Sequence, residues 1–427
     1  METCQPSIAS VTQRRPEAPY YVKGLALGLS AYLIGIHLWT WVLTVPIFLG
    51  GRADFRQLYA AGYMARSGQS RQLYDYDSQR RFQNQVVSQT DLALPFIRPA
   101  YEAVLFVPLS LLPYRVAYFT WLAINLALLA ICYRLLFPRM EELHHIYRWL
   151  PAAIFFGFLP IAAALIQGQD SIFLLTLLTA ASVLLERGKE VSAGLLIGLG
   201  LFKFQIVIPM ALMFLIWRRF RLISGFAVTA SLVTLVSLWV VGLAGSAAYV
   251  RTLITMGAGL VREPHEVNKP VANLMANLHG LVFGLAGSSL SGFWIVFVTA
   301  ILSGVVIFTA VISGRIAKRL DHQFLVATTA SALVSYYLLI HDMSVLLIPI
   351  ALTLGRFVIA EAIGARDGRI MARAAALMFV APICESFVPD HFYVVALPLC
   401  AFFFVLAHNS QRAANELQIS TSLPLKV

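Results

Sequence analysis

Residues 222–243, LISGFAVTASLVTLVSLWVVGL, form an apolar stretch without a single charged side chain. A helix that crosses the hydrocarbon core of a bilayer needs about 20 such residues. This stretch therefore predicts a transmembrane helix. Comparable stretches lie at residues 24–47, 114–136, 149–166, 170–186, 290–313, 321–340, 343–360, 373–388 and 391–408. Together they predict an all-α, polytopic membrane helix bundle with about 10–13 membrane segments.

The composition agrees with this fold class. Of the 427 residues, 59% are hydrophobic and 12% are charged, and the mean hydropathy is +0.76. A soluble domain carries about 25% charged residues. These values exclude a soluble enzyme, a disordered chain and a small disulfide scaffold. Cys4, Cys132, Cys384 and Cys400 form no CxxC pair, and three of them lie in apolar stretches, where a cysteine behaves as a small hydrophobic residue.

Lysine and arginine predict the orientation of the segments, because short cytoplasmic loops carry an excess of both residues. The net charge of +11 therefore indicates basic cytoplasmic loops and no nucleic-acid partner. Residues 1–23 are expected in the cytoplasm, and 24–408 form a single transmembrane domain with long outer loops at 50–98 and 244–289. The tail 409–427 is expected to be cytoplasmic and mobile. The basic clusters expected inside are Arg14/Arg15/Lys23, Arg134/Arg139/Arg148, Arg187/Lys189, Arg218/Arg219/Arg221, Arg315/Lys318/Arg319 and Arg366/Arg369/Arg373.

Two apolar stretches are interrupted. Residues 99–112 contain Pro108, with Pro113 just after them, and indicate a re-entrant or interfacial segment. Residues 190–217 are interrupted by Lys203, Gln205 and Pro209 and predict two short helices that form a hairpin.

The first outer loop predicts two helices. Residues 54–66, DFRQLYAAGYMAR, have an amphipathic pattern with Arg56 and Arg66 on the polar face, which indicates a helix lying along the outer membrane surface. Residues 77–89 predict a second helix, with Asp77 or Ser78 at its cap. From the residues alone, Asp54 is either the cap of the first helix or a catalytic carboxylate at the membrane edge.

Four stretches carry a resemblance to a known family. They are GGRADFRQLYAAGYMARSGQSRQLYD at 50–75, RPAYEAVLFVPLSLLP at 98–113, a long stretch at 166–214 that begins IQGQDSIF, and SYYLLIHDMSVLLIPI at 335–350. In this order the chain resembles the polyprenol-phosphate-sugar-dependent glycosyltransferases of the GT-C superfamily, and within them glycosyltransferase family 87. The family usually has Tyr-Pro-Pro near the position where this chain has Ile97-Arg98-Pro99-Ala100.

The resemblance implies a membrane enzyme that transfers a hexose, mannose by expectation, from a polyprenyl phosphate to a lipid or glycan acceptor on the outer side. Asp54 matches the acidic residue that relatives use as general base after the first membrane helix. A sugar hydroxyl becomes a good nucleophile when a positioned carboxylate accepts its proton. One base without a covalent partner implies inversion at the anomeric carbon. The expected partners are this donor, the acceptor and the lipids of a bacterial-type plasma membrane, and the chain implies no protein partner.

Several further residues are candidates for binding the donor phosphate or sugar. Lys203 either pairs with the phosphate or extends to the membrane surface. His341 and Asp342 are either sugar and phosphate ligands or structural residues, and Gln167, Gln169 and Asp170 form either a sugar contact or a polar turn. The basic residues considered as phosphate contacts are Arg98, Arg262, His265 and Lys269.

Two patterns that are typical of metal sites have simpler explanations. Asp75-Tyr76-Asp77 matches the D-x-D pattern of nucleotide-sugar enzymes, but it falls on the outer face and is better explained as a turn and helix cap. His144 and His145 have no spaced partner. The sequence therefore predicts neither a metal nor a cofactor.

A transporter or lipid flippase is the alternative function. Transporters place ionisable residues near the midplane, often in repeated halves. This chain has Lys203 and His37 in apolar stretches but no repeat, and its other ionisable residues gather in the outer loops. An inactive relative that serves as a scaffold is the third possibility.

Overall fold

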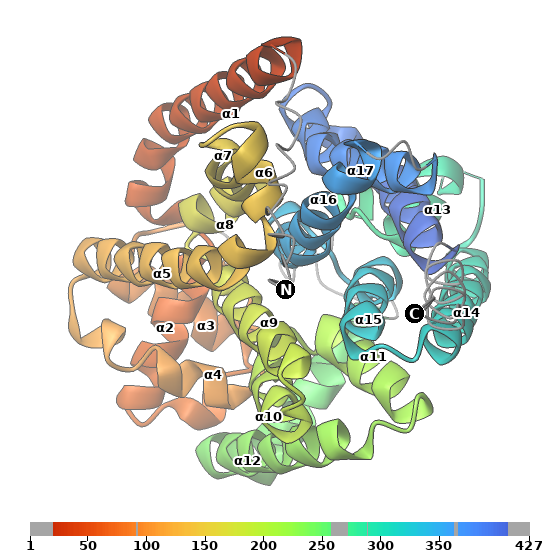
Figure 1. Ribbon diagram of the computed structural model, residues 1–427. Coiled ribbons are helices and arrows are strands. Elements are labelled where there is room, and N and C mark those ends of the chain that lie inside the picture. Colours follow the sequence, from red (N-terminus) through yellow and green to blue (C-terminus); the bar gives the residue numbers. More distant parts are fainter. Residues whose placement is uncertain (1–19, 91–92, 258–271, 288, 363–365, 409–427) are drawn as a thin grey trace, which may run out of the picture.

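The computed structural model describes residues 20–90, 93–257, 272–287, 289–362 and 366–408, and these residues form helices and connecting turns without any strand (Figure 1). The prediction of an all-α, polytopic helix bundle is therefore confirmed. The predicted N-terminal segment and C-terminal tail lie outside the described residues, apart from residues 20–23, which begin the first helix.

Four of the five long apolar candidate spans correspond to predicted membrane segments, and the fifth, Glu190–Ile216, covers the predicted hairpin. By length and composition alone, the described residues contain five candidate spans, or six if the bent pair α7–α8 counts as one; the five are Tyr114–Arg139, Glu190–Ile216, Phe220–Thr255, Gly292–Ala317 and Asp390–His408. The remaining predicted segments correspond mostly to helices of 15–16 residues. The bounds are α1 Tyr20–Ile47, α5 Tyr114–Leu136, α7 Leu150–Gly157, α8 Leu159–Gln167, α9 Ser171–Glu186, α12 Phe220–Gly257, α14 Gly292–Ala317, α15 Leu320–Val334, α16 Leu347–Ala362 and α17 Arg366–Val380.

Short helical turns connect these elements and several carry polar residues. The bend of 50° between α7 and α8 falls at Phe158, just before Pro160 in the first turn of α8. The other short elements are η1 Phe48–Arg52, η4 Phe137–Arg139, α6 Glu141–Ile146, η7 Ile340–Leu346, η8 Ala381–Ser386 and η9 Pro389–Val395.

The stretch around Lys203 reverses direction, as the sequence predicts. It consists of α10 (Glu190–Leu199), η5 (Gly200–Lys203) and α11 (Phe204–Ile216). A Cβ at Gly194 would lie 1.9 Å from the Leu222 carbonyl oxygen, and one at Gly198 would lie 2.9 Å from that of Phe226. A residue four positions later in α10 thus contacts a residue four positions later in α12, so the two helices run parallel. Because α11 connects them through a short turn, it must run the opposite way.

The predicted cytoplasmic clusters lie at the ends of these helices that are remote from residue 203. Arg139, after α5, forms an ion pair with Glu186 at the end of α9. Arg219, after α11, donates a hydrogen bond of 2.5 Å to the Lys318 carbonyl oxygen after α14. Four of the predicted clusters therefore lie toward one end of the bundle. This shared end is the pattern that the positive-inside rule requires.

The first loop folds against the bundle as two helices, α2 (Phe55–Arg66) and α3 (Tyr76–Val86), with η2 (Ser70–Gln72) between them (Figure 1). The interrupted segment 99–112 follows as α4 (Ala100–Leu105) and η3 (Leu109–Leu111). The helix over 54–66 forms as predicted, and Arg66 on its expected polar face is exposed, but the expectation for Arg56 is wrong. Arg56 is 1% exposed, and its guanidinium donates hydrogen bonds to Gln83, Asn84 and the Ser88 carbonyl oxygen. The arginine is buried because the C-terminal part of α3 and the residues just after it supply enough acceptors to satisfy its charge.

The second helix of this loop begins one residue earlier than predicted. Asp75 is its cap, because its carboxylate accepts a hydrogen bond from the Ser78 backbone N–H, and the expectation of Asp77 or Ser78 is wrong. Asp77 instead lies 3.2 Å from Arg80. The two carboxylates of the D-x-D pattern therefore have separate structural roles.

The second long loop is partly helical. Helix α12 continues to Gly257 beyond a break at Gly242, where φ is 71°, and η6 (Ala272–Leu274) and α13 (Leu278–Ala286) follow. A positive φ favours glycine. The predicted contacts Arg262, His265 and Lys269 lie outside the described residues.

Candidate active site

A cavity of about 290 Å³ lies where the first loop meets the end of α8, the start of α11 and the segment that follows α15. Five of the seven candidate residues line it, although they come from five separate parts of the sequence. Asp342 lies directly behind the lining, and Arg262 is outside the described residues. The candidates in the lining are Asp54, Arg98, Gln169, Lys203 and His341.

Asp54 is oriented toward this cavity and does not cap α2. Its backbone is in the right-handed helical region and its carboxylate makes no capping hydrogen bond. Instead, the carboxylate accepts a hydrogen bond of 2.5 Å from Gln169 Nε2. The next residue, Phe55, is fully buried and its ring packs against Phe106, Tyr114 and Tyr118, with centroids 5.8–6.2 Å apart. This aromatic packing fixes the backbone that presents the carboxylate.

The turn between α8 and α9 brings Gln169 to Asp54. Gly168 has φ of 61°, and a Cβ there would lie 2.7 Å from the Phe55 Cβ, so glycine permits the close approach. Trp121 Nε1 donates to the Gly168 carbonyl oxygen at 2.9 Å, and the Tyr118 hydroxyl donates to that of Ile166 at 2.5 Å. The turn is thus held by α2 and α5.

Arg98 is buried just before α4 and its guanidinium is fully engaged. NH1 lies 2.7 Å from Asp170 Oδ2, NH2 donates to Gln169 Oε1 at 2.9 Å, and Nε lies 3.6 Å from Glu102. Its own carbonyl oxygen accepts a hydrogen bond of 2.8 Å from the Tyr74 hydroxyl. An arginine fork held on three sides is a rigid cation.

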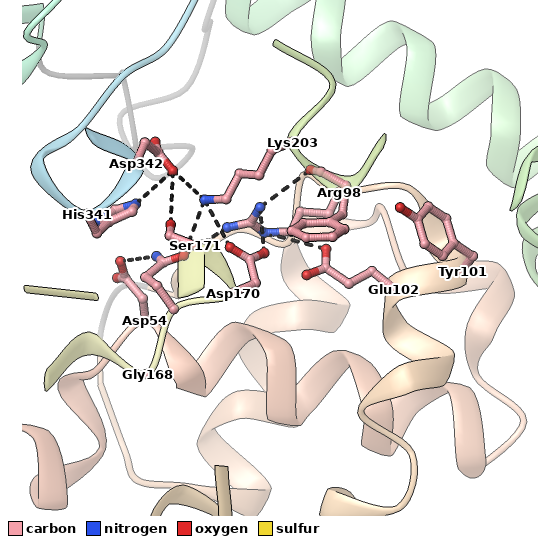
Figure 2. A network of polar contacts seen from close by, with 12 residues as sticks. Asp54, Arg98, Tyr101, Glu102, Gly168, Asp170, Ser171, Lys203, His341 and Asp342 are labelled. Atoms are coloured by element: carbon pink, nitrogen blue, oxygen red, sulfur yellow. Dashed lines mark hydrogen bonds and ion pairs between the residues drawn. The ribbon is translucent and has the colours of Figure 1, made fainter. Parts of the chain in front are cut away.

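Lys203 lies at the reversal between α10 and α11, and its side chain is 2% exposed. Its ammonium lies 3.0 Å from Asp170 Oδ1 and 2.5 Å from Asp342 Oδ1 (Figure 2). A weaker hydrogen bond of 3.5 Å reaches Gln169 Oε1. The amine therefore does not extend to the membrane surface, which was the alternative for this residue.

His341 and Asp342 open the η7 turn after α15. Asp342 Oδ1 also accepts a hydrogen bond of 3.3 Å from Ser171, and Oδ2 accepts one from the Leu339 backbone N–H. Burial by itself raises the pKa of Asp342, but the Lys203 ammonium outweighs it, so the net pKa lies below the usual value and the carboxyl is charged. Burial lowers the pKa of His341, which favours the neutral imidazole.

Gln169 connects the carboxylate with both cations. Its amide nitrogen donates to Asp54, and its amide oxygen accepts from Arg98 and, more weakly, from Lys203. Asp170 then joins the same two cations from the other side (Figure 2). The site is one continuous network that runs from Asp54 through the cations to Asp342.

Glu102 belongs to this network, and the sequence did not single it out. It is 1% exposed, and burial, followed by the charge of Asp170, raises its carboxyl pKa well above the usual value. This favours the neutral acid. The spacing of four residues from Arg98, inside a segment predicted to lie in or near the membrane, was the signal that could have identified it.

Among the described residues, no group of three or more His, Cys, Asp or Glu side chains is arranged to hold a metal ion. The cavity instead combines one carboxylate, two paired cations and several neutral polar groups. Such a set can accept a proton and bind an anionic group side by side.

Comparison with known proteins gives one result. The model of glycosyltransferase family 87 matches residues 96–341, which is more than half of the chain. No curated protein and no solved structure matches the chain. The matched range includes Arg98, Gln169, Lys203 and His341 but not Asp54, which the fold brings to the same cavity. The match supports the predicted membrane glycosyltransferase and not the transporter alternative.

Proposed function

The chain belongs to glycosyltransferase family 87, and from that premise we propose that it transfers a hexose, with mannose as the first candidate, from a polyprenyl phosphate to a hydroxyl of a lipid or glycan acceptor. Family membership and the apolar helices make it an integral membrane glycosyltransferase. The donor, the sugar and the roles of individual residues are the proposal.

The observation that carries the proposal concerns the carboxylates. Of the described residues that line the cavity, Asp54 is the one acidic residue, because Glu102, Asp170 and Asp342 lie behind the lining. It makes no capping hydrogen bond, and it lines the cavity. Asp54 is therefore the general base that accepts the proton of the acceptor hydroxyl.

The cations stabilise the departing lipid phosphate. Arg98 and Lys203 both contact the neutral amide oxygen of Gln169, at 2.9 and 3.5 Å. A phosphate oxygen that takes the place of this amide oxygen gains two charge-assisted hydrogen bonds. The carboxylates Asp170 and Asp342 keep the two cations in position.

The stereochemical outcome follows from the number of acidic residues in the cavity lining. A double displacement needs a second carboxylate at the anomeric carbon, whereas direct attack by an activated hydroxyl needs one base. With Asp54 as the one acidic residue among the described lining residues, the reaction inverts the anomeric configuration.

A direct test uses purified protein in lipid nanodiscs with radiolabelled polyprenyl-phosphomannose and a membrane glycolipid extract. The expected result is transfer of label to an acceptor lipid or glycan, with release of polyprenyl phosphate. Donor forms that carry glucose or galactose identify the sugar. Absence of transfer from all three donors, while folded protein persists, contradicts the proposed donor class.

We further propose that the cavity faces the outside of a bacterial-type plasma membrane and that both chain termini are cytoplasmic. The basic residues Arg139, Arg219 and Lys318 lie toward the end of the bundle remote from the cavity. Short loops with excess Lys and Arg remain cytoplasmic. Membrane lipids therefore surround the apolar helices while the cavity opens at the outer surface.

Cysteine labelling tests this orientation. In a variant whose four native cysteines are replaced by alanine, Ser67→Cys after α2 and Lys189→Cys before α10 are both exposed positions. An impermeant maleimide is expected to label the cysteine at 67 in intact spheroplasts and the cysteine at 189 only after permeabilisation. The reverse pattern overturns the orientation.

A further inference from the structure

The charged groups of the cavity already have protein partners, whereas a set of neutral side chains in its lining has none among the described residues. Arg98, Lys203 and Asp54 each have protein partners within 3 Å. By contrast, Gln57, Gln167 and Gln205 line the same cavity, and no described residue hydrogen-bonds their side-chain amides. The Gln167 amide oxygen is buried without a hydrogen bond from any described residue, and a polar group withheld from water needs a partner. The amides of Gln57 and Gln205 line the same cavity without a partner in the described part of the chain, so the three side chains together point to a ligand.

The Gln57 side chain does not make the capping hydrogen bond that its position at the start of α2 allows. Asp54-x-x-Gln57 has the spacing of a capping box, in which both side chains would bond to backbone N–H groups at the start of the helix. Asp54 makes no capping bond, and Gln57 has only a backbone bond of 3.1 Å to the Asp54 carbonyl oxygen. Its side chain is 9% exposed and lines the cavity beside the proposed base.

Gln167 and Gln205 come from two separate turns of the site, the one after α8 and the one before α11. Gln167 is the last residue of α8, two positions before Gln169, and its amide oxygen is buried without a hydrogen bond. Gln205 lies in the first turn of α11, two positions after Lys203, and its side chain is partly buried. Both amides are thus close in sequence to residues that contact Asp54 or the cations.

We propose that Gln57, Gln167 and Gln205 form a neutral subsite that binds the hydroxyl groups of a pyranose. The inference rests on the proposed function, and it assigns the recognition of the sugar to residues other than the base and the cations. The hexose comes either from the donor or from the acceptor, and the hydroxyl chemistry is the same for both.

The chemistry of the three side chains fits this ligand. A primary amide presents two donors and one acceptor, and a sugar hydroxyl is at once a donor and an acceptor. The cavity of about 290 Å³ is at the small end of pockets that hold small molecules, roughly 300–1,000 Å³. A site built to hydrogen-bond a hydroxyl also rejects a ligand that lacks it, because its polar groups then remain unpaired.

The test separates sugar binding from phosphate binding. Protein in nanodiscs is titrated with polyprenyl-phosphomannose, with polyprenyl phosphate that carries no sugar, and with methyl α-mannopyranoside as a soluble sugar. Gln57→Met, Gln167→Met and Gln205→Met keep the side-chain length and remove the amide. Gln85→Met, at an exposed position of α3 outside the cavity lining, is the matched control.

If the subsite binds the sugar of the donor, the ratio of the affinity for the mannosyl lipid to that for the sugar-free lipid falls by roughly 2- to 10-fold in each cavity variant. If the subsite binds the sugar of the acceptor, this ratio is unchanged and the affinity for methyl α-mannopyranoside falls by the same factor. Both results support the subsite, provided that Gln85→Met behaves as wild type. Unchanged affinities in both arms, or a wild-type protein that binds neither sugar, overturn it.

A different set of binding results would contradict the proposed function. A wild-type protein that binds methyl α-mannopyranoside through the glutamines but neither polyprenyl lipid contradicts the donor class and leaves the subsite intact. Unchanged binding of sugar-free polyprenyl phosphate by a variant shows that the variant is folded. If a methionine variant does not fold, Gln57→Asn, which retains a shorter amide, takes its place and is expected to weaken sugar binding in the same arm.

Discussion

Asp54→Asn is expected to lower the rate of hexose transfer by about 10²–10⁴-fold, the usual contribution of a positioned general base. Asparagine keeps the shape of the side chain and can still bond to Gln169, which now contacts the carboxylate at 2.5 Å. The amide has no basic lone pair to accept the proton of the acceptor hydroxyl. Initial rates of label transfer from polyprenyl-phosphomannose measure the loss.

The stability of the same variant separates this role from helix capping. Because the Asp54 carboxylate makes no capping bond, Asp54→Asn is expected to leave the thermal midpoint in detergent unchanged. Asp75→Ala is the matched control, since Asp75 does cap its helix, α3. That variant is expected to lose about 0.5–2 kcal/mol of stability and to retain transfer by the folded protein. The opposite pattern would make Asp54 a structural cap.

Lys203→Met is expected to destabilise the protein by about 3–5 kcal/mol and to abolish transfer. Its ammonium is the shared partner of Asp170 and Asp342, both 1% exposed, and its removal leaves two buried carboxylates with only Arg98 and the neighbouring hydrogen bonds as compensation. Thermal unfolding in detergent and initial rates of label transfer measure the two effects.

A double variant shows that the lost stability is electrostatic. Lys203→Met combined with Asp342→Asn removes one cation and one carboxylate, so it is expected to recover part of the stability lost in the single variant. Lys189→Met, at an exposed lysine before α10, is the control for the loss of a positive charge and is expected to be neutral. A single variant as stable as this control would contradict the buried ion-pair network.

Much of the fold follows from the sequence because the bilayer restricts the choice. An apolar stretch of about 20 residues must satisfy its backbone internally, and a helix does so. The prediction for 114–136 therefore coincides with α5, Tyr114–Leu136. The polar break at Lys203 likewise indicated the reversal between α10 and α11. A lysine in the middle of a spanning helix would be costly in hydrocarbon, whereas a turn at this residue places it at the end of two short helices.

The first loop was harder to predict because its environment is protein and not lipid. Arg56 follows the amphipathic pattern of a surface helix, but Gln83 in α3 and Ser88 just after it accept its hydrogen bonds. A helical pattern identifies which face is polar, but it does not identify what packs against that face.

The candidate site was predictable by residue type and only partly by partner. Asp54, Lys203 and His341 were singled out as ionisable groups at membrane edges or breaks, and the fold places all three on one cavity. Gln169 was a candidate either for a sugar contact or for a polar turn, and in the fold it connects Asp54 with Arg98. Such contacts join residues more than 70 positions apart, so they depend on helix packing that local patterns do not encode.

Single-turnover transfer by wild type and Asp54→Asn, at saturating polyprenyl-phosphomannose, is the most direct test of Asp54 as the base of this cavity. Donor binding is measured on the same samples, so that chemistry and binding are separated. The account predicts that the variant binds the donor as wild type does and transfers its hexose about 10²–10⁴-fold more slowly. Equal single-turnover rates for the two proteins, with the donor bound, would contradict it.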